Sequence, residues 1–512
     1  MPLADRRFVV AGSGPIADEC AELLQALDAD VVRVGRATAG LASADAEGAI
    51  DATGTVAAAE PPFPVVDVAA EFDATDAWAR SGAMVLTGQA DGPPLPCPFD
   101  ALPTRVTAAG SVVQLLAATT FGVALPLDAL ALLGERAAIT GYSRHGSIAV
   151  GGACEMVRSA DGWIALNLPR ADDLSLLPAL LDGDIDDASD VVGMQHAIRR
   201  RSSADLVARG AELGLAIAAW STAHDLAASP YVIDGARPRA PRLRPASVGT
   251  PGAGRARGHG DTHESIVLDL SSLWAGPLAG GLLARAGARV VKVEGARRPD
   301  GARRGASQFF DLLNAEKRCI VIDFDDADDI SMLEALIARA SLVIEGSRPR
   351  VMDRLGIDPA AVVARGTSWL SITAYGRDGA NRNRIGFGDD VAVSSGLAIA
   401  GDPPLFVADA VADPIAGLFA AVAGLACLGA NRAHLVDASL FAATRFAAGA
   451  LVSTPHAAGV SSAPAAPRAR IARGVADGVG ASTDAILAEL VPDAWRDRRA
   501  KMPGPRSREG DL

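Results

Sequence analysis

The stretch SIVLDLSSLWAGPLAGGLLARAGARVVKVE, from Ser265 to Glu294, decides the fold class. Its predicted segments are a strand from Ile266 to Leu270, a turn at Gly276 and Pro277, a helix from Leu278 to Ala286 and a strand from Ala288 to Val293. Such a βαβ unit places a helix N-terminus, with unpaired N–H groups, at the carboxyl end of a strand. A phosphate or nucleotide-like ligand is favoured there, although most βαβ units are only structural.

The same order of segments occurs near the start of the chain. Residues Arg7 to Gly35, RFVVAGSGPIADECAELLQALDADVVRVG, pass from a strand through a Gly-Pro turn and a helix to a valine strand. An internal repeat of this length indicates architecture before any chemistry is known. We therefore predict an internal duplication, with two related halves joined near residues 236–262.

The composition limits the class of protein. With 512 residues and a hydrophobic fraction of 49%, the chain has enough apolar matter for several folded domains. The net charge of −13 argues against a nucleic-acid-coating protein, so arginines must hold any anionic ligand locally. The apolar stretches are short and broken by glycine, and no signal-type segment is present. We expect a cytoplasmic protein without a membrane partner.

Metal and hydrolase motifs are missing from the sequence. The five cysteines are widely spaced without a CxxC pair, and neither HExxH nor GxSxG occurs. We expect no bound metal, and we interpret most cysteines as small buried hydrophobic residues in a reducing compartment.

Between and after the two units the chain changes character. Asp161-Gly162, in ADGWIALNL, predicts a tight hairpin turn within residues 142–168. The Pro/Arg/Gly-rich stretch from Gly235 to Gly260 predicts an extended basic linker. Beyond it, strands alternate with helices, which predicts a parallel, doubly wound sheet. From about Ser461 we expect a short helix flanked by loose chain.

Seven segments follow one another between Ser265 and Ala443: LWAGPLAGGLLARAGARVVKVE, LLNAEKRCIVIDF, LVIEGSRPRVMDRLGIDPAAV, SITAYGRDG, RIGFGDDVAVSSG, VADPIAGLFAAVAGLACL and HLVDASLFAA. The first half adds WARSGAMVLTG with DGPPL, VGGACEMVRSADGWIAL and LGLAIAAWSTAHDLAASPYV. In this order they resemble the family III CoA-transferases, the group that includes formyl-CoA transferase, carnitine CoA-transferase and alpha-methylacyl-CoA racemase.

The resemblance implies an α/β fold with two Rossmann-like parallel-sheet halves, the first eroded, and a smaller α+β domain. The implied segments are an eroded nucleotide-type domain (1–140), a small domain (141–234), a linker (235–262), a catalytic domain (263–450) and a C-terminal tail (451–512). Family members are known as interlocked dimers. We therefore expect an intramolecular pseudo-dimer, and further homo-oligomerisation stays open.

The resemblance also implies a catalytic residue. The family's nucleophilic aspartate opens a helix written D-x-x-x-G, which Asp413 and Gly417 match, whereas the first half has Val106 before Gly110. The residue pattern alone also fits a plain N-cap, because Asp413 stands at an expected helix start before a proline.

The implied reaction transfers coenzyme A between an acyl-CoA and a carboxylic acid. Asp413 would attack the thioester, forming first a mixed anhydride and then an aspartyl-CoA thioester. A glycine-rich loop with Gly146, Gly151 and Gly152 would supply N–H donors and a cover against water.

Residues of this sequence that match the family's CoA-binding positions are Ala275, Gly276, Lys292, Lys317, Arg318, Arg348 and Arg354. Basic side chains among them suit the CoA phosphates. Gly295 and Gly346 replace larger residues of the family, and Arg297 and Arg298 are candidate substitutes.

Two alternatives stay open. One is an acyl-CoA racemase or isomerase, although Phe387 stands where the racemases have a catalytic histidine, and Asp389 and Asp390 are out of register. The other is a non-catalytic CoA-binding relative, against which the carboxylate of Asp413 argues.

Overall fold

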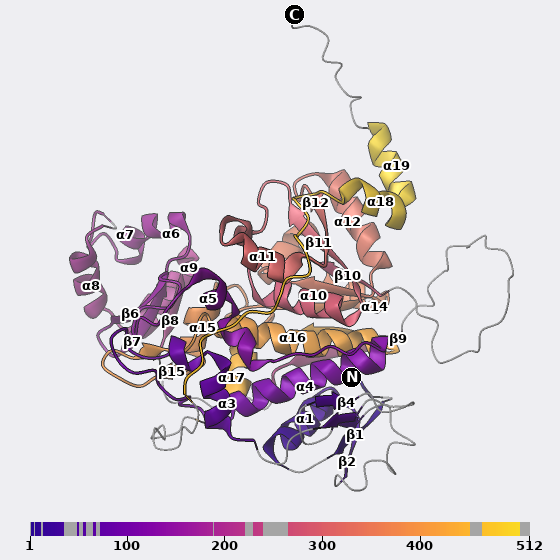
Figure 1. Cartoon of the computed structure of the whole chain (residues 1–512). Coiled ribbons are helices and arrows are strands. Elements are labelled where there is room, and N and C mark those ends of the chain that lie inside the picture. Colours follow the sequence, from indigo (N-terminus) through magenta and orange to yellow (C-terminus); the bar gives the residue numbers. More distant parts are fainter. Residues whose placement is uncertain are drawn as a thin grey trace, which may run out of the picture.

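The computed structural model describes residues 2–4, 6–11, 14–34, 49–50, 55–57, 65–67, 72–187, 189–220, 229–238, 265–450 and 463–501. They form a mixed α/β fold with a seven-stranded, a five-stranded, a three-stranded and a two-stranded sheet. In Figure 1 the large sheet and its helices lie above, helices α16 and α4 cross the middle, and the five-stranded sheet lies below.

The seven-stranded sheet contains the unit that begins at Ser265. Its strands, in spatial order, are β12 (Arg318–Ile322), β11 (Arg289–Gly295), β10 (Ile266–Asp269), β13 (Leu342–Glu345), β14 (Ser368–Ser371), β17 (Arg432–Asp437) and β9 (Val232–Pro238). The first six are parallel, which confirms the predicted parallel sheet, and β9 is antiparallel. Numbered along the chain, the parallel strands read 3-2-1-4-5-6. The order reverses between β10 and β13, where the strand ends of such sheets open a ligand-binding crevice.

Helices pack on both faces of this sheet. They are α10 (Ala275–Ala286), α12 (Ala327–Arg339), α13 (Pro349–Leu355), α14 (Pro359–Ala364) and α16 (Ala412–Gly429). The same half also contains α11 (Ser307–Asn314), α15 (Gly388–Ser394) and α17 (Leu440–Ala448). Strand β10 shows why: Val267 belongs to the core shared with α10 and α16, whereas Ile266 and Leu268 belong to the core shared with α12. A strand buried on both faces reads as a continuous apolar run.

Helix α16 is the apolar centre of the molecule. It packs against α10 and against α4 (Leu102–Phe121) of the first half. The approach to α10 needs glycine at position 417, because a Cβ there would lie 2.6 Å from the carbonyl oxygen of Ala275. Among the helices of the described ranges, α16 alone is long and apolar enough to cross a membrane, and 89% of the qualifying window is buried inside the protein.

The first half forms the second βαβ unit, as predicted. Its sheet has the spatial order β2 (Asp30–Val34), β1 (Arg7–Ala11), β3 (Ala49–Ile50), β5 (Val65–Asp67) and β4 (Thr55–Ala57). Helix α1 (Pro15–Ala26) connects the parallel pair β1 and β2 and packs on α4. Further helices are α3 (Ala74–Ser81) and α5 (Glu135–Thr140), with 3₁₀ turns at Met84–Leu86 and Leu130–Gly134. The descent of both halves from a duplication stays a prediction.

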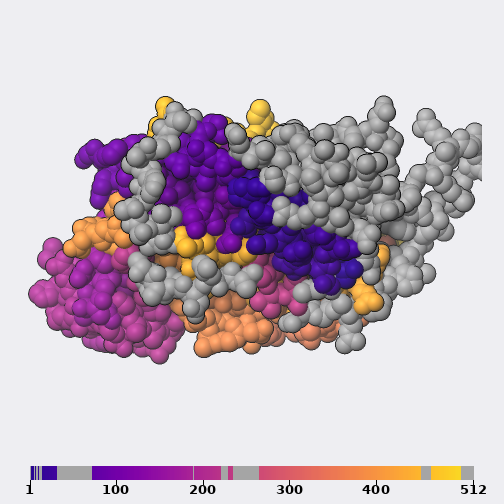
Figure 2. Space-filling view, turned by 90° about the horizontal axis from the view of Figure 1, so that it is seen from below, coloured from indigo at the N-terminus to yellow at the C-terminus, as the bar shows by residue number. Residues whose placement is uncertain are grey.

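A small antiparallel unit follows. It contains β6 (Cys154–Arg158), β7 (Trp163–Asn167), β8 (Ala216–Ala219), α6 (Ala171–Ser175), α7 (Leu177–Leu180), α8 (Val191–Arg199) and α9 (Ser203–Leu213). The predicted hairpin at Asp161-Gly162 is confirmed, since Arg158 pairs with Trp163 across it. The unit has a core of its own and forms one end of the molecule, in magenta in Figure 2.

The chain outside these units differs in part from expectation. Residues 235–238 of the predicted linker continue β9, which pairs with β17, and residues 239–264 lie outside the described ranges. The C-terminal region has two helices, α18 (Thr483–Leu490) and α19 (Pro492–Lys501), where a single short one was expected. Before them, residues 463–482 cross from the first half to the second. The amide of Ala465 donates to Ala79, and Arg473 pairs with Glu316 at 3.2 Å.

Candidate functional site

A pocket of about 240 Å³ lies where the strand order of the large sheet reverses. Its walls are residues 271–273 after β10, 346–348 after β13 and 372–374 after β14, together with Arg382, residues 384–387 and Asp413. Ala275 and Gly276, two of the predicted CoA-binding residues, also line it. Helix α10 begins at Ala275 and not at the predicted Leu278, so the expected turn at Gly276 and Pro277 is the first turn of this helix. The βαβ units of the second half therefore place Asp413, the predicted nucleophile, in the wall of this pocket.

Asp413 is the second residue of α16 and not its N-cap. Val411 occupies the N-cap position, and no side chain forms a cap hydrogen bond there. The capping interpretation of Asp413 is therefore wrong. Its carboxylate lines the pocket, and the backbone N–H of Gly388 at the start of α15 acts to lower its pKa.

The half-buried carboxylate of Asp413 lies near several other charged groups. Burial raises its pKa to about 7, and Asp389 and Asp390 add to the shift, whereas Arg136 and the Gly388 N–H oppose it. Burial likewise raises the pKa of Asp389 to about 7, against the influence of Arg136. Carboxylates that raise the pKa of one another in this way have coupled titrations.

Asp389 and Asp390 hold the structure around Asp413. Asp389 accepts the N–H of Ala410 at 3.1 Å, in the turn before α16. Asp390 is fully buried, accepts the Nδ2 of Asn167 at 2.7 Å, and thereby fastens α15 to β7 of the small unit. Phe387 lines the pocket with a side chain that has no acid or base function.

The turn before α16 is strained. Ala408 and Ala410 have φ angles of 53° and 43°, in the left-handed region that costs an L-residue about 1–2 kcal/mol. Between them, Asp409 is fully buried and paired with Arg136 of α5. Two strained residues shortly before Asp413 indicate a backbone held in place by its surroundings.

The predicted cover loop packs against the same region and does not line the pocket. A Cβ on Gly151 would lie 3.1 Å from an Nη of Arg136, and the carbonyl of Gly146 accepts the N–H of Phe406 at 2.9 Å. Gly146 and Gly152 have φ angles of +69° and +78°, which suit glycine. The loop thus reaches the turn before Asp413 from the first half.

A cluster of arginines lies at the pocket. Arg348 lines it, as do Arg170, Arg382 and Arg384, which the sequence patterns had not singled out. Burial lowers the pKa of Arg348, and the like charges of Arg350, Arg170 and Arg298 add to this shift. Arg348 has no carboxylate partner among the ion pairs of the described residues. The uncompensated charge suits a phosphate.

The other predicted CoA-binding residues lie elsewhere. Lys317 is buried and donates to Asp269 at 2.7 Å, and Lys292 is buried and pairs with Asp300 at 2.8 Å. Arg318 and Arg354 are exposed, and none of these four residues lines the pocket. Both lysines are internal counter-charges that support the strand ends.

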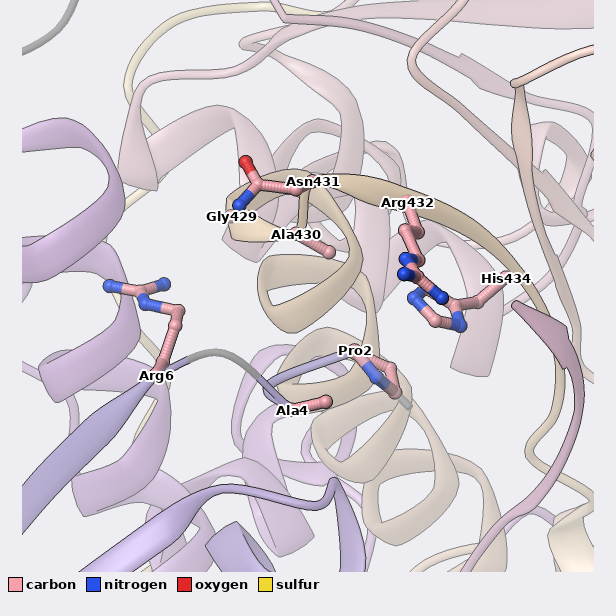
Figure 3. A pocket seen from close by; sticks show the side chains of 8 residues that line it. All are labelled: Pro2, Ala4, Arg6, Gly429, Ala430, Asn431, Arg432 and His434. Atoms are coloured by element: carbon pink, nitrogen blue, oxygen red, sulfur yellow. The ribbon is translucent and has the colours of Figure 1, made fainter. Parts of the chain in front are cut away.

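A second, smaller pocket of about 120 Å³ lies at the opposite end of α16 (Figure 3). Arg6, Asn431, Arg432 and His434 contribute polar side chains to it, and no carboxylate lines it. Among the residues with described positions, no group of three or more His, Cys, Asp or Glu side chains is placed to hold a metal ion.

Comparison with known proteins gives a family for the region that contains the pocket. A family model described as CoA-transferase family III matches residues 263–474. An acyl-CoA transferase of Fusarium pseudograminearum is 31% identical over 200 residues, 34% of this chain and 44% of the relative. Succinyl-CoA–D-citramalate CoA-transferase of Chloroflexus aurantiacus is 29% identical over 175 residues, 32% of this chain and 44% of the relative.

A crystal structure of the hypothetical protein Rv3272 from Mycobacterium tuberculosis covers 35% of this chain and 55% of its own, with 28% identity and a TM-score of 0.33. The chain spans less than half the length of the two curated relatives. The region matched by the family model contains Asp413 and most of the pocket wall. The resemblance found between Ser265 and Ala443 is therefore confirmed, because residues 263–474 match CoA-transferase family III. The resemblance of the first half stays a prediction.

Proposed function

We propose that the protein is a CoA-transferase that moves coenzyme A between an acyl-CoA and a carboxylic acid, with Asp413 as nucleophile. One observation carries the proposal: the family-matched domain places a carboxylate that is no helix cap in a pocket at the strand ends of its sheet. A carboxylate with a pKa near 7 is ionised in a large fraction of molecules at neutral pH and is then nucleophilic.

The proposed chemistry keeps the energy of the thioester in covalent form. An oxygen of Asp413 attacks the thioester carbonyl, the C–S bond breaks, and CoA leaves as a thiolate while an acyl-aspartyl anhydride remains. The thiolate then attacks the aspartyl carbonyl and releases the first acid. The incoming carboxylate attacks this aspartyl thioester, which releases the CoA thiolate and forms a second acyl-aspartyl anhydride. The thiolate then attacks the acyl carbonyl of this anhydride, which gives the new acyl-CoA and frees Asp413. The N–H of Gly388 is placed to stabilise charge on the aspartyl oxygens.

The arginine cluster supports CoA as the substrate. Arg348 lies in the pocket wall with Arg170, Arg382 and Arg384, and Arg298 and Arg350 add charge beside it. Arg348 and Arg298 had been singled out in the sequence as basic candidates for the nucleotide. In our proposal they bind the phosphates, while the thioester reaches inward to Asp413.

We further propose a pseudo-dimer with one active site, built from the five segments predicted in the sequence. Helices α4 and α16 pack on each other as related helices of two copies would. Val106, the predicted counterpart of Asp413, is fully buried and is the fifth residue of α4, whereas Asp413 is the second residue of α16. A cytoplasmic location and the absence of nucleic-acid partners belong to the same proposal.

The decisive test is mass spectrometry of the intact protein after incubation with acetyl-, succinyl- and longer-chain acyl-CoA in the presence of hydroxylamine. We expect a hydroxamate or CoA adduct on Asp413, absent from Asp413→Ala and retained in the control Asp91→Asn, which changes an exposed acid. CoA binding without an adduct would favour the non-catalytic relative. Exchange of the substrate α-proton in D₂O without transfer would favour the racemase.

A further inference from the structure

Arg136 reaches from the first half into the catalytic domain. Its Nε donates to Oδ2 of Asp409 at 3.0 Å and its Nη2 pairs with Oδ1, although 273 residues separate the two in sequence. Its guanidinium also lies over the ring of Trp274, 5.0 Å from the centroid, directly before α10. The side chain is 26% exposed and Asp409 is fully buried.

Asp409 lies in the backbone turn that sets the start of α16. The turn has positive φ at Ala408 and Ala410, and the N–H of Asp413 donates to the carbonyl of Ala410 at 2.9 Å. The position of the Asp413 carboxylate therefore depends on the conformation of residues 408–410.

Three groups hold this turn, and two of them come from the first half. Oγ1 of Thr87 accepts the N–H of Ala408 at 3.0 Å, and Arg136 neutralises Asp409. The third, Asp389 of α15, accepts the N–H of Ala410. Without Arg136, the turn would keep its strained backbone and a buried carboxylate without a counter-charge.

We propose that Arg136 is a positioning residue for Asp413: its ion pair with Asp409 holds the strained turn from which the nucleophile is presented. The first half is then a working part of the active site, and the eroded copy keeps the residues that support the other copy's aspartate. This inference rests on the proposed transferase function for its kinetic test.

The neighbouring residue provides a matched control. Glu135 is fully buried and forms a second ion pair between distant segments, accepting Nε of Arg470 at 2.6 Å and its Nη2 at 2.8 Å. The Glu135–Arg470 pair starts on the same helix as Arg136 and also has a fully buried carboxylate, but it joins this helix to residues 463–482. Arg470→Met therefore removes a comparable ion pair without contact to the turn.

The first measurement compares Arg136→Met, Arg136→Lys and Arg470→Met in Asp413-dependent acyl-CoA exchange. For Arg136→Met we expect kcat to fall about 100-fold, as for an ångström-scale displacement of a reacting group. KM for the acyl-CoA should stay unchanged because the Arg348 cluster is intact. Arg136→Lys should recover part of kcat, since it keeps the charge and loses the bidentate geometry. Arg470→Met should lower the melting temperature and leave kcat unchanged. Equal losses of kcat in Arg136→Met and Arg470→Met, corrected for folded fraction, would overturn the proposal.

Hydrogen exchange of peptides covering residues 404–416 separates this inference from the proposed function. We expect faster exchange in Arg136→Met than in wild type, and wild-type exchange in Arg470→Met. If the wild-type protein forms no Asp413 adduct, the transferase proposal fails. The hydrogen-exchange result still tests whether Arg136 positions the turn, and unchanged hydrogen exchange in Arg136→Met would overturn that inference.

Discussion

The backbone of Gly388 lies directly against the carboxylate of Asp413: a Cβ added at Gly388 would stand 2.6 Å from Oδ2 of Asp413. The same Cβ would also overlap the carbonyl oxygen of Ala410. Glycine at position 388 thus lets the start of α15 present its N–H to the nucleophile.

Gly388→Ala should therefore disable the site more than it destabilises the fold. The methyl group must displace Asp413 or the turn before it, and we expect kcat to fall about 100-fold, with a loss of about 1–3 kcal/mol in the free energy of unfolding. Gly478→Ala is the control, because nothing lies within 4 Å of a Cβ there. Full activity in Gly388→Ala would show that Asp413 does not need this close contact.

The raised pKa of Asp413 predicts two pH effects. Exchange should increase as the pH rises through about 7, since only the ionised carboxylate is nucleophilic, and Asp389 titrates in the same range. Stability should change in the opposite sense. Between the ordinary value of 3.8 and about 7 the folded state holds a proton that the unfolded state has lost, so stability decreases as pH rises.

The variant Asp413→Asn tests the predicted decrease in stability with rising pH, because asparagine does not titrate. Its melting temperature should exceed that of wild type, with a difference that grows from pH 5 to pH 8. Asp91→Asn, at an exposed acid, should follow wild type throughout. A constant difference between Asp413→Asn and wild type across this range would contradict a raised pKa in the folded state.

Local patterns predicted the elements that these experiments probe. The strand-turn-helix-strand units, the hairpin at Asp161-Gly162 and the position of Asp413 follow from short-range signals and motif order. The contacts that support the site do not follow from such short-range signals, because the Arg136–Asp409 pair depends on how the two halves pack. The patterns also marked Lys317 as basic without showing the buried carboxylate that neutralises it.

Arg348→Ala should weaken binding of the acyl-CoA and spare the chemical step. We expect KM to rise about tenfold or more, since a hydrogen bond to a charged group contributes about 1.5–3 kcal/mol, and the salt dependence of KM should become weaker. Arg339→Ala, at an exposed arginine on α12, should leave KM unchanged. If instead Arg318→Ala or Arg354→Ala raised KM while Arg348→Ala did not, the phosphates would bind at another edge of the sheet.

Lys317 should prove to be a structural residue. Its Nζ donates to Asp269, to the carbonyl of Pro277 and to Asn314 at 2.7, 2.8 and 2.9 Å, all inside the protein. Lys317→Met leaves the carboxylate of Asp269 buried without its counter-charge, and we expect urea unfolding to show a loss of about 3–5 kcal/mol.

The double variant Lys317→Met with Asp269→Leu should recover most of this loss, because it removes both buried charges together. Arg354→Ala, which changes an exposed basic residue, should keep wild-type stability. A Lys317→Met protein that is as stable as wild type but has a raised KM for acyl-CoA would instead make Lys317 a ligand of the CoA phosphates. Measuring both quantities for Lys317→Met therefore distinguishes the two roles, because loss of a buried counter-charge changes the free energy of unfolding, whereas loss of a phosphate ligand changes KM.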